Sequence, residues 1–314
     1  MESAQNLKRR MRSVQNIGQI TKAMELVAAT KMRRSQELAL NSRPYAYAAL
    51  EIMGIIASLK DVAMPEILTE RPVEKTAFLI VTSDKGLAGS FNSAVIRKFE
   101  QYVRANKINP TDPKYAFIAI GQKAKSYLER RGMHIAHSFT RVGDYTTMQE
   151  VDPISDELIA GYLAHEFDEV VSFSTTFVTA LRQDVFVRQI LPVDIEKIRE
   201  SIRLLVPEAG RFSQYFDAEF YENEKEQNVD YIIEPSPADV LAELARSLLR
   251  IRIYHMILEA NASEHSARRV AMKNASDNAS EISEDLTVIY NKSRQASITN
   301  QIIEVTSGAQ ALQQ

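Results

Sequence analysis

The chain has 314 residues, of which 45% are hydrophobic and 25% charged, a composition typical of folded globular proteins rather than of disordered ones. Its net charge of -3 argues against a nucleic-acid binder as a whole, and the absence of cysteine excludes disulfides, thiolate nucleophiles, cysteine–zinc sites and thiol redox switches. Because no run of about 18 apolar residues is present and the first residues lack the apolar core of a signal peptide, we expect neither a transmembrane helix nor secretion.

Residues 1–60 are predicted to form the first long helix. Met1 to Arg43 contain one Gly and no Pro, and Pro44 is expected to kink the helix. Apolar residues recur at spacings of three and four, which draws one stripe along a helix: Leu7, Met11, Val14, Ile17, Ile20, Met24 and Val27. Nine Lys or Arg against three Glu make residues 1–43 basic, which is typical of a contact with nucleic acid, acidic lipid or acidic protein. The apolar stripe favours a coiled coil that passes acidic protein surfaces.

Residues 76–194 alternate strand-forming and helix-forming runs. Apolar runs predict strands over 77–81, 115–120, 170–178 and 185–190, and amphipathic patterns predict helices over 91–103 and 122–131. This alternation predicts a Rossmann-like α/β domain with a mostly parallel sheet covered by helices. Residues 195–235 are polar and acidic, and we interpret them as a peripheral insertion or connection.

Residues 236–314 are predicted to form a second, longer helix. A heptad row indicates a left-handed coiled coil: Leu244, Ile251, Leu258, His265, Met272, Ala279 and Leu286. A second row is expected three residues further on, and it includes Ala275, Ile282 and Ile289, so Ile282→Asp is expected to bury an unpaired charge.

About 75 helical residues would span roughly 110 Å, whereas a compact chain of this length has a radius of gyration of about 20 Å. The helix should therefore protrude and needs a partner. The simplest partner is the N-terminal helix of the same chain, packed antiparallel as a coiled-coil shaft; an intermolecular coiled coil would explain the periodicity as well.

The sequence offers little chemistry. A strand, a Gly-rich turn and a helix start coincide at Asp84-Lys85-Gly86-Leu87-Ala88-Gly89, where a phosphate could bind, but the spacing fits neither a P-loop nor a dinucleotide site, which favours a structural turn. The five His residues form no metal-binding pattern. The carboxylates between Glu150 and Glu169 are interpreted as a solvated face or a docking surface. We therefore expect no catalytic residue, metal or cofactor.

Four motifs distributed over the chain resemble the γ subunit of the F1 part of F-type ATP synthase. They are NIGQITKAMELVAATKMRR at 16–34, SDKGLAGSFN at 83–92, MKNASDNA at 272–279 and YNKSRQASITNQIIEVTSGAQAL at 290–312. The order of long helix, α/β domain and longer helix also fits. The resemblance is weakest over 195–230, and the chain lacks the cysteine pair of plastid members, so it resembles the bacterial type.

The resemblance implies that the helix pair is a rotating shaft in the central hole of a ring of alpha and beta subunits, with the C-terminus at its tip. The α/β domain would be the foot, above the epsilon subunit and the ring of c subunits. The chain would then be a non-catalytic subunit without a cofactor, at the cytoplasmic face of the bacterial inner membrane, coupling ion flow to ATP synthesis.

The resemblance also implies contact residues on the shaft. Arg268 and Gln295 would meet a catch loop of the beta subunit, Arg294 and Thr299 belong to the same motif, and Lys22 with Met24 would lie near an acidic beta segment. Two other functions stay open on the residues alone. One is a homodimeric coiled-coil adaptor that binds acidic partners, and the other is a nucleotide-binding α/β protein with coiled-coil arms.

Overall fold

A computed structural model describes residues 4–59, 62–179, 182–194 and 232–311 of the chain. The predicted insertion at 195–235 falls almost wholly outside the described residues. The chain divides into two compact units. The first unit combines residues 1–28 with residues 268–314, and the second unit comprises residues 29–267.

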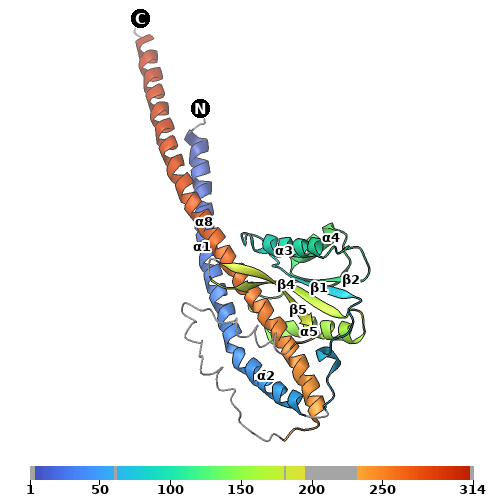
Figure 1. Cartoon of the computed structure of the whole chain (residues 1–314). Helices are drawn as coiled ribbons and strands as arrows, with labels where there is room; N and C mark the ends of the chain where they lie inside the picture. Colours follow the sequence, from blue (N-terminus) through green and yellow to red (C-terminus); the bar gives the residue numbers. More distant parts are fainter. Residues whose placement is uncertain (1–3, 60–61, 180–181, 195–231, 312–314) are drawn as a thin grey trace. The chain divides into compact units, whose positions relative to one another are not determined.

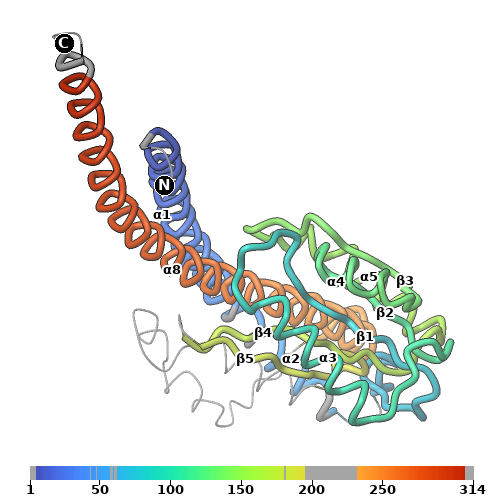
Figure 2. Tube along the Cα trace, turned by 90° about the horizontal axis from the view of Figure 1, so that it is seen from above, coloured from blue at the N-terminus to red at the C-terminus, as the bar shows by residue number. Residues whose placement is uncertain are grey.

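Two long helices occupy the two ends of the chain (Figure 1). They are α1 (Ala4–Asn41) and α8 (Pro237–Ala311). The single kinked helix predicted over residues 1–60 is two helices, because α1 ends at Asn41 and α2 (Arg43–Ser58) begins with Pro44 in its first turn. At that position the N–H that proline lacks would have no helical acceptor. In the first unit, α1 and α8 lie side by side with both termini at the same end (Figures 1 and 2), so the two helices are antiparallel.

The second unit contains a five-stranded sheet with strand order β3-β2-β1-β4-β5. All neighbouring pairs are parallel except β4 and β5, which confirms the mostly parallel α/β fold. The strands are β1 (Thr76–Val81), β2 (Tyr115–Ile120), β3 (Ile135–Phe139), β4 (Glu169–Phe177) and β5 (Gln183–Leu191). The connecting helices are η1 (Glu66–Leu68), α3 (Phe91–Ala105), α4 (Gln122–Arg130) and α5 (Met148–Leu163).

Alternate residues of β1 face two separate cores, as the pleat of a strand requires. Phe78 and Ile80 join an aromatic core with residues of α3 and α4, in which Phe99 packs edge-on against Phe173 at a centroid distance of 5.2 Å. The opposite side of the strand contributes to a larger core with α2, α5 and the part of α8 between Leu241 and Ala260. Both faces of the central strands are therefore buried, which explains their continuous apolar runs.

Helix α5 was not predicted, because its sequence is rich in carboxylates and contains Pro153. Its start carries a capping box that sequence reasoning missed. The backbone N–H of Thr147 donates to the Glu150 carboxylate at 2.9 Å, and the N–H of Glu150 donates to the Thr147 hydroxyl at 3.4 Å.

The seam of the first unit has the heptad periodicity that was predicted but not all of the predicted residues. Buried or half-buried residues of α1 follow alternating spacings of four and three: Leu7, Met11, Val14, Gly18, Thr21 and Glu25. The facing row of α8 contains Met272, Ser276, Ala279, Ser283, Leu286 and Tyr290.

Three predicted seam residues of α1, Ile17, Ile20 and Val27, are exposed, as are Ile282 and Ile289 of α8. The prediction for these residues was wrong because it followed every large apolar side chain, whereas in the middle of the seam the helices meet at small side chains. A Cβ placed on Gly18 would lie 3.4 Å from the Cβ of Ala279, and the hydroxyl of Ser276 lies 3.4 Å from the Gly18 carbonyl oxygen.

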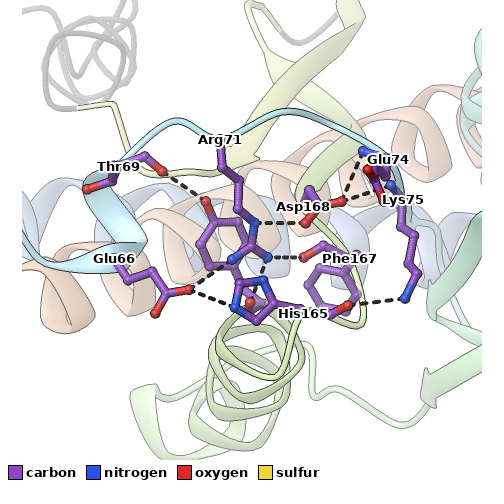
Figure 3. Close-up of polar contacts among 9 residues, drawn as sticks. Glu66, Thr69, Arg71, Glu74, Lys75, His165, Phe167 and Asp168 are labelled. Atoms are coloured by element: carbon purple, nitrogen blue, oxygen red, sulfur yellow. Dashed lines mark hydrogen bonds and ion pairs between the residues drawn. The ribbon is translucent and has the colours of Figure 1, made fainter.

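Arg71 ties the segment before β1 to the α5–β4 connection (Figure 3). Its Nε donates to Asp168 at 2.8 Å and Nη1 donates to Glu66 at 2.9 Å, while Nη2 donates to the carbonyl oxygens of Tyr162 and Phe167, both at 2.8 Å. The guanidinium also stacks 4.1 Å from the centre of the Tyr162 ring. The planar guanidinium of Arg71 thus fixes the segment from η1 to β1, because its N–H groups donate to several different acceptors.

Replacing a seam residue should separate the observed seam from the predicted one. Leu286→Asp places an unpaired charge where the side chain is 6% exposed, so it should destabilise the full-length chain by several kcal/mol. Ile282→Asp, at a residue that is 48% exposed, is the matched control and should cost less than about 1 kcal/mol. Thermal unfolding followed by circular dichroism measures both, and equal losses would contradict the assignment of the seam.

Asp168 should contribute to stability in a pH-dependent manner. Burial acts to raise the pKa of its carboxyl, but the backbone N–H groups of Lys75 and Glu74 and the charge of Arg71 outweigh burial, so the pKa lies below its ordinary value. A depressed pKa in the folded state means that the stabilisation is present at neutral pH and is lost as the pH falls through that value.

Asp168→Asn should therefore lower the stability of the full-length chain by about 2 kcal/mol at pH 7 and by much less at pH 3. Calorimetric unfolding at the two pH values tests this. The control is Asp112→Asn, at a more exposed carboxylate 3.5 Å from Lys114, which should have little effect at either pH. A stability difference between Asp168→Asn and the unchanged chain that does not vary with pH would contradict the prediction.

Candidate interaction surface of the helix pair

The outer surface of the first unit carries large apolar side chains that the seam does not bury. Those on α1 are Ile17, Ile20, Leu26 and Val27. Those on α8 are Ile282, Val288, Ile289, Ile298, Ile302, Ile303 and Val305. Exposed apolar residues that gather on one element, rather than occurring singly, mark a surface that contacts another molecule.

The end of α8 is almost free of charge. Between Arg294 and Ser307 the only charged residues are Arg294 and Glu304, and every residue of this stretch except Ala296 is exposed. Threonine hydroxyls in the stretch donate to the helix itself, from Thr299 to the Gln295 carbonyl at 2.9 Å and from Thr306 to the Ile302 carbonyl at 2.8 Å. The outward surface is therefore formed by aliphatic side chains, methyl groups and uncharged amides.

The two helices of the first unit differ in charge. Residues 4–28 of α1 contain five basic residues and one acidic residue, whereas residues 268–311 of α8 contain five of each. Lys22, on the basic helix, pairs with Glu25 at 2.9 Å, and its side chain is still mostly exposed. One side of the helix pair is thus basic and the other is close to neutral.

The predicted contact residues lie in the first unit but do not form one cluster. Arg294, Gln295 and Thr299 are exposed and lie within about one and a half turns of α8. Arg268 is half-buried and lies 27 residues before Gln295, which is about 40 Å along a helix. The two residues that the resemblance places against one loop are therefore far apart along α8.

The remaining two predicted residues lie near the seam of α1. Met24 is half-buried, one position before the seam residue Glu25. The side chain of Lys22 is mostly exposed, so its ammonium group is accessible to a partner, although it also forms an ion pair with Glu25. These positions are compatible with a contact made by the flank of the helix rather than by its outermost face.

The residues that follow β1 bind the N-terminus of α4. The first N–H groups of α4 donate to groups at the end of β1: Gln122 to the Asp84 carboxylate at 2.9 Å, Lys123 to the Ser83 carbonyl at 3.1 Å and Ala124 to the Thr82 hydroxyl at 2.7 Å. The Gly-rich turn itself leads into α3 (Phe91–Ala105) and is closed by contacts within it: the N–H of Phe91 donates to the Ala88 carbonyl at 3.1 Å, and the N–H of Ser83 donates to the Asn92 side-chain oxygen at 2.9 Å. These contacts favour the structural turn over the nucleotide site.

The carboxylates between Glu150 and Glu169, interpreted as a solvated face or a docking surface, have several partners within the second unit. Asp156 pairs with Arg250 of α8 at 2.9 Å, Glu157 contacts His137 at 3.0 Å, and Asp168 is buried against Arg71. Sequence reasoning had no signal for these partners, because they are distant along the chain.

In the described part of the chain no group of three His or acidic residues is arranged to hold a metal ion. Within the same residues, no helix is long and apolar enough to cross a membrane.

Comparison with known proteins agrees with this architecture. A family model described as ATP synthase matches residues 3–312. The chain is 37% identical to the ATP synthase gamma chain of Roseiflexus sp. (strain RS-1) over 317 aligned residues, which include 99% of each chain. It is 36% identical to the ATP synthase gamma chain of Moorella thermoacetica, with 99% of this chain and 100% of that chain covered.

Solved structures with the same fold include a chain of the Euglena gracilis mitochondrial ATP synthase, in a structure of its OSCP, F1 and c-ring, with a TM-score of 0.62 and 15% identity over 98% of this chain and 94% of that one. A chain of the Tetrahymena thermophila mitochondrial ATP synthase central stalk and c-ring has a TM-score of 0.56 and 22% identity, and the match covers 82% of this chain and 99% of that chain. At these identities the two structures establish the fold alone. The match of the family model over almost the whole chain and the full-length relatives establish more: the chain belongs to the ATP synthase gamma-chain family, the family of the central rotor subunit of F-type ATP synthases.

Proposed function

We propose that the chain is the rotor that couples ion flow through a membrane sector to ATP synthesis or hydrolysis on beta subunits, by turning inside a ring of three alpha and three beta subunits. The observation that carries the proposal is the outer surface of the helix pair. An antiparallel coil that leaves its large apolar residues outside and ends in an uncharged stretch is suited to a sleeve that surrounds it without strong pairing.

The charge difference between the two helices supplies the asymmetry that such a mechanism needs. In a ring with three chemically identical beta subunits, each subunit would face a different side of the coil, basic at α1 and nearly neutral at α8. A partner shifts a conformational equilibrium only through contacts that differ between the states. Turning the coil would move these contacts from one beta subunit to the next, and ATP hydrolysis would drive the same sequence in reverse.

Within this role we assign the catch contact to Arg294, Gln295 and Thr299, which share one short stretch of α8. Lys22 and Met24 would meet an acidic beta segment from α1. Arg268 would contact the ring at a different level, because about 40 Å of helix separates it from Gln295.

The remaining parts of the proposal concern the setting of the rotor. The chain would be a non-catalytic subunit without a cofactor, and its second unit would contact an epsilon subunit and the ring of c subunits. It would lie at the cytoplasmic face of a bacterial inner membrane, held there by the membrane sector. The full-length bacterial relatives support this setting.

Co-purification from the native host tests the proposal. A tagged copy of the full-length chain should bring down alpha and beta subunits at a ratio of 3:3:1 together with epsilon and c subunits, and the mass of the free chain should be that of a monomer. A stable homodimer without ring subunits would support the coiled-coil adaptor instead. Saturable nucleotide binding by the purified chain would support the nucleotide-binding alternative.

The catch assignment predicts the behaviour of a double variant. Arg294→Ala with Gln295→Ala removes one charge-assisted contact and one amide contact, which together contribute about 1.5 to 3 kcal/mol to one rotary state. Both residues are exposed on a helix that tolerates alanine, so the complex should assemble but should hydrolyse ATP at least tenfold more slowly.

Lys273→Ala, at an exposed residue of the same helix to which no ring contact is assigned, is the matched control and should leave turnover unchanged. Steady-state ATPase assays on the purified complex give the comparison. Loss of assembly in the double variant would assign the pair a structural role, and unchanged turnover would show that the catch lies elsewhere.

A further inference from the structure

One loop of the second unit contacts both long helices through a single carboxylate. Asp144 lies between β3 and α5, and its Oδ2 accepts a hydrogen bond from the Nζ of Lys31 in α1. The other carboxylate oxygen, Oδ1, lies 3.3 Å from Nε2 of His265 in α8. Asp144 therefore bridges α1 and α8 within this unit.

The loop that carries Asp144 is itself fixed to α8. The side-chain amide of Asn261 donates to the Gly143 carbonyl at 3.2 Å and to the Thr146 hydroxyl at 3.1 Å, and that hydroxyl donates to the Gly143 carbonyl at 2.8 Å. Thr146 is buried. Because the residues on both sides of Asp144 are held in this way, its carboxylate has little freedom to swing out.

His265 occupies a position where the other members of the row are apolar. The side chain is 2% exposed and falls in the heptad row that contains Leu258, Met272 and Ala279. A polar residue in such a row lowers stability relative to an apolar one, but it specifies which residues of the two helices face each other. The carboxylate of Asp144 lies beside His265, so a shift of α8 that moves His265 away would lose this contact.

The charges around Asp144 keep its carboxyl ionised. Burial acts to raise its pKa, but the hydrogen bond from Lys31 and the charges of His265, Lys31 and Lys85 outweigh burial, so the pKa lies below its ordinary value. Lys31 and Asp144 therefore meet as an ion pair, whose partial burial strengthens it relative to a pair at the surface.

The middle of the seam in the first unit is poorly suited to fix the register of the two helices. There Gly18 faces Ala279 and Ser276, and small side chains make shallow knobs that resist sliding weakly. Both helices run without a break from one unit into the other. Lys31 lies 13 residues after Gly18 and His265 lies 14 residues before Ala279, so the sequence separation from the seam is nearly the same on the two helices.

We propose that Lys31, Asp144 and His265 form a register clamp, in which the loop between β3 and α5 fixes α1 against α8 and thereby sets the residue pairing of the whole coil. The clamp is a property of the chain itself and goes beyond the proposed rotor function. In a rotor, the register clamp would fix the positions of the contact residues of α1 and α8 relative to one another along the coil axis.

The absence of cysteine allows a direct test by disulfide trapping in the full-length chain. Gly18→Cys with Ala279→Cys reports the observed register, because the two Cβ atoms would be 3.4 Å apart, close to the separation found in disulfides. Gly18→Cys with Leu286→Cys reports a slip of one heptad. In the otherwise unchanged chain the first pair should oxidise and the second should not.

Breaking the clamp should allow the slipped register to form. Asp144→Ala and, separately, Lys31→Met should each raise the initial rate of the off-register disulfide about tenfold, the loss expected for a charge-assisted contact. Exchanging the charges with Lys31→Asp and Asp144→Lys should restore the low rate. If Asp144→Ala does not fold, Lys31→Met decides the result, because it leaves the loop unchanged.

The matched control is Asp156→Ala, which removes an ion pair of the second unit between α5 and Arg250 of α8 and should not change the off-register rate. An equal increase in this control would show general loosening and would overturn the proposal. An off-register rate that stays low in both Asp144→Ala and Lys31→Met would overturn it as well. Trapping in the free chain does not require ring subunits, so failure of the clamp and failure of the rotor function can be distinguished.

Discussion

The structure depends on the antiparallel pairing of α1 with α8 through a seam whose middle part consists of small side chains. A pairing within one chain avoids the entropy that association of two molecules would cost. At Gly18 and Ala279 the backbones come close, and the large apolar residues remain available on the outside. The small residues in the middle of the seam therefore determine how closely the helices pack there.

The second unit complements this weakly specified seam with well-specified polar contacts. Arg71 uses its guanidinium donors for carboxylates and carbonyl oxygens of two neighbouring segments, and Asp168 accepts from two backbone N–H groups as well. Directional bonds of this kind lose much of their strength when either partner moves, whereas apolar contacts tolerate small shifts. The α/β domain can thus hold loops in place that a purely apolar core would leave adjustable.

The sequence predicts much of the second unit because its strands are buried on both faces. The continuous apolar run from Tyr115 to Ile120 gave both ends of β2 correctly. The seam was harder to predict, since periodicity alone cannot tell whether Ile282 or the less apolar Ser283 faces the partner helix. Tertiary pairs such as Arg71 with Asp168, 97 residues apart, leave no local signal at all.

The candidate site shows the same division. Composition revealed a basic first helix, and the structure adds a nearly uncharged, exposed stretch at the end of α8. The residue assignments came from resemblance, and helix geometry separated Arg268 from Gln295 by a distance that motif matching does not measure. Sequence alone could not find the bridge at Asp144, because it joins three segments that only the fold brings together.

The close approach at Gly18 and Ala279 also affects the diameter of the coiled coil. Packed helices lie about 8 to 10 Å apart, and the smaller distances occur where the contacting side chains are small. A coil with Gly and Ala at its contact is slimmer there than a leucine zipper, so an enclosing protein needs a narrower bore to touch it on all sides. A bulkier residue at Gly18 would push the helices apart and widen the coil, and an enclosing bore would then have to stretch or bind it more tightly.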